Sequence, residues 1–264
     1  HSETFNFYLM RQYLFCFLLF FPFSTVMVSA KSLVDVVKEV KPSVVGIGVH
    51  APLATISNQL HGTGFVVGNG KYVVTNKHVI NSQLEEGIKS QRVVFVPQGS
   101  ASKVLPIKQI FKSKHRDVAM LELETVLPAL NLVASDVVID DGSSVAITGF
   151  PIGAILGLFP ATHAGIVAAF TPDVIPAHHS SQLSQRFLKR AEAPAMIYQL
   201  DLTAYPGNSG SPVYLSETGE VFAIINKGFV KETKEAAIES PSGITYAIPI
   251  SELYSLAAEY DILL

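Results

Sequence analysis

The sequence predicts an all-β protein made of two antiparallel β-barrels. Between Pro42 and Ile250 the chain is divided into about a dozen short apolar runs, each bounded by Gly, Pro, Asn, Asp or Ser. Helical spacing of apolar residues is found only at the two ends of this region. Many short strands with so few helices are typical of a β-sandwich or of paired barrels.

The composition indicates a folded protein that does not bind nucleic acid. The 264 residues are 48% hydrophobic and 16% charged, which is enough for one large core or two small ones. The formal net charge is -3, and no run of Lys or Arg provides the positive patch that a polyanion requires. Nucleic acid is therefore not expected as a partner.

Residues 1–30 differ from the rest of the chain and are not expected to take part in the fold. After Met10, one arginine precedes a solid apolar run through Phe23, and small residues then lead to Lys31 in the pattern of a cleavage site. This arrangement predicts a secretory signal peptide, with the first nine residues lying upstream of the start methionine. The apolar run is shorter than the roughly 20 residues of a membrane helix, so an uncleaved anchor is the less favoured alternative. We expect no stable membrane span after cleavage.

Cys16 is the only cysteine, and it lies in the predicted leader. The mature chain would therefore form no disulfide and would offer no thiolate to a metal or a substrate. An exported protein without disulfides suggests the bacterial periplasm or exterior.

A helix is expected first, over 32–41, and a second one at about 250–260. The first has apolar residues at helical spacing, with Ser32 as a candidate N-cap and Asp35 in a capping-box arrangement, and Pro42 stops it. The second has one apolar stripe and is expected to pack on the core.

The predicted strands follow between these helices, in one domain of residues 31–264. We place the first six-stranded barrel at about 43–135 and the second at about 136–250. The strands are expected at 43–49, 62–68, 72–76, 92–97, 105–111, 118–123, 144–150, 165–170, 196–200, 211–215, 221–226 and 244–250. The polar, proline-bracketed connection 172–195 is longer than an ordinary loop, and it is either a functional lid or a disordered insertion.

Ser209 lies in a stretch, "DLTAYPGNSGSPVY", whose small residues have two explanations. Gly and Asn tolerate positive φ and Pro206 presets a turn, so the stretch can be a simple connector. Alternatively, the glycines let successive N–H groups converge in front of Ser209, where an oxyanion would develop. A serine nucleophile also needs an imidazole base and a carboxylate that orients it.

His78 and Asp117 are the candidates for that base and acid. His78 follows two strands joined by an Asn69-Gly70 hairpin. Asp117 stands at the threshold of an apolar strand, where a carboxylate is costly unless it has a partner. The simpler alternatives are a surface histidine and a turn aspartate that pairs with His115 or Arg116.

Six collinear segments together resemble one protein family. They are "GTGFVV...YVVTNKHVI", "HRDVAMLEL", "GIVAAF", "QLDLTAYPGNSGSPVY", "GEVFAIIN" and "ITYAIP". From about Ser32 to about Tyr260 the chain is similar to the catalytic domain of the HtrA-like (Deg-type) branch of the chymotrypsin-fold serine endopeptidases. The order His, Asp, Ser agrees with that family.

The resemblance implies a role for each site residue. His78 would be the general base and acid, Asp117 its orienting carboxylate and Ser209 the nucleophile. The oxyanion hole would consist of Gly207, Asn208 and Ser209, with the N–H groups of the first and last as donors. Asn208 stands where digestive relatives carry an Asp, so activation by propeptide cleavage is not expected. Ser211 replaces a glycine common in the family, which should be tolerated.

The resemblance also places a primary specificity pocket. Its floor would lie at Thr203, which carries no carboxylate, so small or medium aliphatic side chains are expected rather than basic ones. The walls would come from Ile225, Asn226, Lys227, Tyr246 and Ala247.

The implied activity is peptide-bond hydrolysis of exported or misfolded proteins through an acyl-enzyme, with no metal or cofactor. The remaining histidines lack metal-ligand spacing, and a patch of His178, His179 and Asp173 would be adventitious. Because the chain ends shortly after its last helix, we expect a protease domain without a PDZ domain, and trimer formation stays open. Two alternatives remain: a catalytically silent or autoinhibited peptide-binding protein, and an esterase using the same residues.

Overall fold

The structure is a computed structural model, and it describes residues 31–81, 90–99, 101–151, 158–173, 194–228 and 243–264. Within these ranges, no helix is both long enough and apolar enough to cross a membrane. The predicted leader and most of the 172–195 connection lie outside the described residues.

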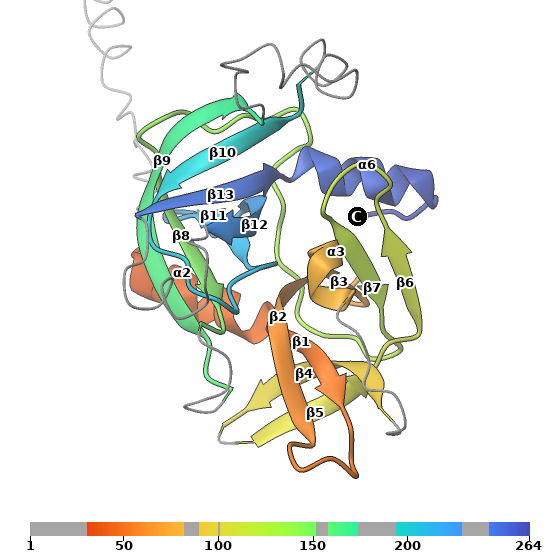
Figure 1. Cartoon of the computed structure of the whole chain (residues 1–264). Coiled ribbons are helices and arrows are strands. Elements are labelled where there is room, and N and C mark those ends of the chain that lie inside the picture. The colour runs from red at the N-terminus through yellow and green to blue at the C-terminus, as the bar shows by residue number, and fades with distance from the viewer. Residues whose placement is uncertain (1–30, 82–89, 100, 152–157, 174–193, 229–242) are drawn as a thin grey trace, which may run out of the picture. The chain divides into compact units, whose positions relative to one another are not determined.

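The described chain is mostly antiparallel β-structure, which confirms the predicted all-β class (Figure 1). The first sheet has the strand order β5-β4-β1-β2-β3-β7-β6. Its strands are β1 (Val44–His50), β2 (Asn58–Val67), β3 (Tyr72–Thr75), β4 (Gln91–Gln98), β5 (Ala101–Pro106), β6 (Gln109–Lys112) and β7 (Ala119–Glu122).

The second sheet is a closed six-stranded barrel with the order β10-β13-β12-β11-β8-β9. Figure 1 shows its strands grouped together, with α6 continuing from the end of β13. They are β8 (Ser144–Gly149), β9 (Ala161–Pro172), β10 (Met196–Asp201), β11 (Pro212–Leu215), β12 (Val221–Gly228) and β13 (Ile244–Pro249).

The prediction of six strands in the first barrel is wrong by one, since its sheet has seven described strands. The predicted strand 105–111 is in fact the end of β5 and most of β6. Pro106 pairs with Val93 at one edge of the sheet, whereas Gln109 pairs with Glu122 at the other. The two halves adjoin in sequence, but the chain crosses from one edge of the sheet to the other at residues 107–108.

The two predicted helices are confirmed, and the described chain has two further short turns, the 3-10 turn η2 (Lys41–Ser43) and helix α3 (Lys77–Ile80). Helix α2 (Leu33–Val40) begins at the N-cap Ser32, whose hydroxyl accepts from the backbone N–H of Asp35. Helix α6 (Ser251–Glu259) buries Leu253, Leu256 and Ala257. The short helix α3, which carries His78, was not predicted as helix.

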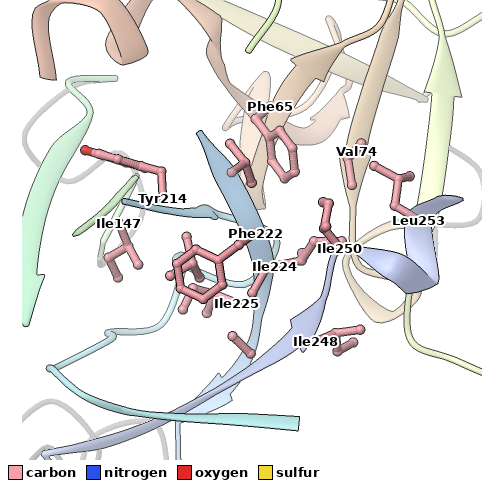
Figure 2. Close-up of a cluster of buried hydrophobic side chains, with 14 of the residues drawn as sticks. Phe65, Val74, Ile147, Tyr214, Phe222, Ile224, Ile225, Ile248, Ile250 and Leu253 are labelled. Atoms are coloured by element: carbon pink, nitrogen blue, oxygen red, sulfur yellow. The ribbon is translucent and has the colours of Figure 1, made fainter. Parts of the chain in front are cut away.

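The central strands of the first sheet are buried on both faces, and one of these faces joins the core of the second barrel. Phe65 and Val74 belong to a cluster shared with the second barrel, while the intervening Val66 and Val73 belong to a separate cluster. This alternation follows from the period of two in a strand. Figure 2 shows the side chains of Phe65 and Val74 in one cluster with those of Phe222 and Ile250. The shared cluster therefore fixes the sheet that bears His78 against the barrel that bears Ser209.

Candidate active site

Asp117 and His78 form a directly hydrogen-bonded pair. Nδ1 of His78 lies 2.6 Å from Oδ2 of Asp117, and the backbone N–H of His78 donates to Oδ1 at 3.0 Å. An ionised carboxylate can only accept, so the ring proton resides on Nδ1 and Nε2 is left with a lone pair. The arrangement can accept a proton at Nε2 and stabilise the resulting imidazolium.

Strand pairing brings these two residues together. Thr75 at the end of β3 pairs with Ala119 at the start of β7, so the segments just beyond both strands are neighbours. The Asn76 amide donates to the Asp117 carbonyl oxygen at 2.9 Å, which fixes the turn before β7. The register of the sheet thus places the Asp117 carboxylate beside the His78 imidazole, although the two residues are 39 positions apart in the sequence.

The side chain of Arg116 binds acceptors in parts of the chain that are distant in sequence from its neighbour Asp117. Its side chain is 8% exposed, and its guanidinium lies 3.3 Å from the Asp173 carboxylate and 3.5 Å from that of Glu252. It also donates to the carbonyl oxygen of Met196 at 3.0 Å. A buried guanidinium needs such acceptors. Arg116 therefore connects the loop of Asp117 to the second barrel and to α6.

The loop that carries Ser209 begins with a tight turn. Pro206 and Gly207 are its central residues, Gly207 has a φ of 101°, and the N–H of Asn208 donates to Tyr205 at 3.0 Å. Proline followed by a residue with positive φ is the signature of a type II turn. Gly210, with a φ of 85°, provides a second left-handed position just after Ser209.

Five of the eight backbone polar groups from Gly207 to Gly210 have a partner in the described chain. The carbonyl oxygens of Gly207, Asn208 and Ser209 accept from Thr63 Oγ1, Ser211 N and Thr63 N at 2.7, 2.9 and 2.9 Å. The N–H of Gly210 donates to Ile225 at 2.9 Å. Among the described residues, the N–H groups of Gly207 and Ser209 have no acceptor. These two unused donors, one of which is the N–H of the serine itself, can hold an oxyanion.

The Ser209 hydroxyl donates to the carbonyl oxygen of Asn226 at 3.1 Å. Within the described part of the chain it makes no hydrogen bond to His78. Asn226 occupies a bulge in β12, where the register with β13 shifts between Ile225 and Lys227. The bulge turns the Asn226 carbonyl toward the serine.

The serine loop packs directly on the segment that carries His78. A Cβ on Gly210 would lie 2.5 Å from Thr75 Oγ1, and one on Gly62 would lie 2.7 Å from Val79 and 3.0 Å from the Ser209 carbonyl oxygen. These glycines allow the two sheets to approach closely around the site. The structure therefore brings all three predicted residues into one region.

The residues expected to form the specificity pocket flank this loop. Ile225 and Ala247 pair between β12 and β13 and are buried, whereas Thr203 and Tyr246 are half-buried. Lys227 pairs with Tyr246 through its backbone, and its side chain lies outside the described residues.

Asn208 is fully buried, and its carboxamide has no partner in the described chain. Ser211 is also fully buried, and the missing side chain of Gly149 makes room for it. A Cβ on Gly149 would lie 2.1 Å from Ser211 Oγ and 2.8 Å from Asn208 Oδ1. Gly149 thus provides the space that the predicted tolerance of this serine requires, while Ser211 Oγ has no hydrogen-bond partner in the described chain.

No group of three or more possible metal ligands occurs in the described ranges. His50 lies 2.7 Å from the Asn58 side chain, and burial lowers the pKa of His61, with a smaller contribution from Arg92. His178 and His179 lie outside the described residues.

His163 gives a pH prediction. Burial lowers its pKa below the ordinary value, its Nε2 has no described partner, and its ring lies 5.6 Å from that of Tyr205. Below pH of about 6.5 the unfolded chain binds a proton that the folded chain resists, so acid lowers the stability. His163→Phe keeps an aromatic ring there and should reduce the loss of thermal stability between pH 7 and 5.

Thermal melts of both proteins at several pH values test this prediction. His50→Gln is the control and should retain the pH dependence of the unmodified protein. An unchanged pH dependence in His163→Phe would contradict the assignment.

A closed barrel joined through a shared core to a second antiparallel sheet, with His, Asp and Ser at their contact, defines a protein of the chymotrypsin-like class. The trypsin-like peptidase domain family matches residues 62–224, and the chain belongs to this family. Its likeness is to the HtrA type, as the sequence resemblance predicted.

The curated relatives are longer proteins of low identity. The chain is 26% identical over 228 residues to serine protease HTRA4 of Homo sapiens, covering 85% of this chain and 40% of that protein. It is 28% identical over 197 residues to a probable periplasmic serine endoprotease DegP-like of Pseudomonas fulva, covering 74% and 34%. The chain thus spans well under half the length of these relatives.

Two solved structures share the fold. The serine endoprotease from Yersinia pestis has a TM-score of 0.58 at 22% identity, covering 88% of this chain and 67% of that one. The HtrA-type protease AlgW with a tripeptide has a TM-score of 0.60 at 22% identity, covering 88% and 65%. These likenesses confirm the chymotrypsin-like fold.

Proposed function

We propose that the protein is a serine endopeptidase in which Ser209, His78 and Asp117 form the catalytic triad. The observation that carries the proposal is the pair of unused N–H groups, at Gly207 and Ser209, in a loop whose other backbone groups are nearly all hydrogen-bonded. Gly207 and Ser209 are half-buried, so a ligand can reach their N–H groups, and a loop that only connects two strands has no need to keep such donors unpaired. An enzyme that must hold a transient oxyanion needs them.

The reaction begins when the Ser209 hydroxyl turns from the Asn226 carbonyl toward Nε2 of His78. His78 takes the hydroxyl proton as Oγ bonds to the peptide carbonyl carbon, and the negative oxygen is held by the two N–H groups. The C–N bond then breaks, and His78 gives the proton to the departing amine. Water attacks the acyl-enzyme with His78 as base, and proton return to Ser209 releases the acid.

The substrates we propose are polypeptides with small or medium aliphatic side chains before the cleaved bond. Thr203 offers no carboxylate for a basic side chain, and the buried neighbours Ile225 and Ala247 are apolar. The relatives are named as serine proteases, and the similar AlgW structure holds a tripeptide. An extended peptide would bind beside a strand edge through main-chain hydrogen bonds.

We further propose that the protein is exported and acts on exported or misfolded proteins. The signal-like segment before Lys31 supports export, and one relative is named as periplasmic.

A second candidate function is peptide binding without catalysis. It is favoured by one observation, which is that the Ser209 hydroxyl bonds to Asn226 rather than to His78. If that hydrogen bond persists with a peptide bound, the serine stays protonated and the protein only holds its ligand.

Labelling with a fluorophosphonate probe separates these two functions. The triad should direct phosphonylation to Ser209, found by mass spectrometry on the peptide that contains residues 201–214, and His78→Ala should prevent it. Binding of peptides without any labelling of Ser209 would favour the silent protein.

A further inference from the structure

The hydroxyl of Thr63 lies at the junction of the two sheets, and sequence reasoning did not single it out. Thr63 is fully buried in β2, yet all of its polar groups are used. Its N–H donates to the Ser209 carbonyl at 2.9 Å, and its own carbonyl accepts from Thr75 Oγ1 at 2.7 Å. Its hydroxyl donates to the Gly207 carbonyl at 2.7 Å and accepts from the N–H of Phe150 at 3.1 Å.

We propose that Thr63 is a positioning residue that sets the orientation of the oxyanion-binding N–H groups of Gly207 and Ser209. This inference rests on the proposed function. Thr63 is outside the proposed triad and outside the loop of Gly207 to Gly210, and it precedes Gly207 by 144 positions in the sequence.

The peptide unit between Gly207 and Asn208 is held at both ends. Its carbonyl oxygen accepts from Thr63 and its N–H donates to Tyr205 at 3.0 Å. No other donor in the described chain bonds to the Gly207 carbonyl. Glycine has little steric resistance to rotation about φ and ψ, so hydrogen bonds, rather than side-chain bulk, must select its orientation.

Loss of the Thr63 hydroxyl would leave the Gly207 carbonyl without its donor. A partly buried carbonyl without a donor is costly, so the peptide unit would turn to find another partner. That rotation changes ψ of Gly207 and φ of Asn208, so the two flanking peptide units, which carry the N–H groups of Gly207 and Ser209, would shift with it. The Ser209 carbonyl would stay bonded to the Thr63 backbone, so the loop would be misaligned rather than detached.

Thr63 also connects the loop of Gly207 to Gly210 with the segment that carries His78. Its carbonyl binds the hydroxyl of Thr75, and Thr75 precedes His78 by three positions. The two parts of the site that come from different sheets are therefore connected through one buried residue.

The test compares Thr63→Val, which keeps the shape of the side chain but lacks the donor, with Thr63→Ser, which keeps the donor. Thr63→Val should lower kcat on a chromogenic peptide about 10- to 100-fold with little change in KM, because the oxyanion forms only in the transition state. A peptide boronate, which mimics the tetrahedral state, should lose affinity by a similar factor. Thr63→Ser should restore most of the activity.

Thr148→Val is the matched control. Thr148 is also fully buried, and its hydroxyl lies 2.8 Å from those of Thr162 and Tyr214 in the second barrel. It should lose stability but keep kcat. If Thr63→Val yields no folded protein, Thr63→Cys keeps a weak donor and should lose at least about fivefold in kcat. A kcat within twofold of the unmodified protein in the folded variant would overturn the proposal.

Amide hydrogen exchange separates this inference from the proposed function. The N–H groups of Asn208 and Gly210, both hydrogen-bonded, should exchange faster in Thr63→Val than in Thr148→Val, even if the unmodified protein hydrolyses no peptide. Equal exchange in both variants would refute the positioning role, whereas an inactive unmodified protein with faster exchange in Thr63→Val would refute only the peptidase assignment.

Discussion

Ser209→Ala should reduce hydrolysis of casein and of peptide substrates by a factor on the order of 10⁴ or more. The substitution removes the atom that forms the acyl bond and leaves the backbone N–H groups of the loop in place. The hydroxyl makes one hydrogen bond, to Asn226 at 3.1 Å, which is worth about 1 kcal/mol net. The thermal transition should therefore move by only a few degrees.

Ser255→Ala provides the control for this substitution. Ser255 is exposed on α6, and its hydroxyl donates to the Ser251 carbonyl at 3.0 Å within the helix. It should keep full activity. Residual activity in Ser209→Ala comparable to that of Ser255→Ala would refute the nucleophile assignment.

Asp117→Asn should lower kcat/KM by about 10³- to 10⁴-fold at neutral pH, because it disturbs the imidazole tautomer. The carboxylate now accepts both the backbone N–H and the Nδ1 proton of His78. An amide has only one acceptor oxygen, and when its NH₂ group faces Nδ1 the ring proton must move to Nε2. Nε2 can then no longer take the proton of Ser209.

Steady-state kinetics and the rate of fluorophosphonate labelling should fall together in Asp117→Asn. Asp136→Asn, in an exposed turn of the chain, should leave both unchanged. A loss of less than about tenfold would mean that Asp117 serves only the local structure and does not orient the base.

The sequence predicted those features of the fold and site that depend on local patterns. Short apolar runs bounded by turn-forming residues located the strands, and the stretch around Ser209 marked its loop through glycine and proline. The pairing of His78 with Asp117 followed from the resemblance to a known family, and the register of β3 with β7 supplies its physical basis.

The features that escaped prediction depend on contacts between distant parts of the chain. The donation from Thr63 to Gly207 spans 144 positions and leaves no trace in local spacing. The direction of the Ser209 hydroxyl depends on a bulge at Asn226, which appears only when β12 pairs with β13. The division of the 105–111 run depends on which edge of the sheet each half joins.

Helix α6 supports the region of the proposed triad through Glu252. Glu252 supplies one of the anions around the guanidinium of Arg116, the residue next to the acid of the proposed triad. Trimming the protein before Ser251 would remove this counter-charge from the buried guanidinium of Arg116. An expression boundary should therefore be placed after Glu259, because a shorter version would lose both the ion pair of Glu252 with Arg116 and the packing of the buried residues Leu253, Leu256 and Ala257.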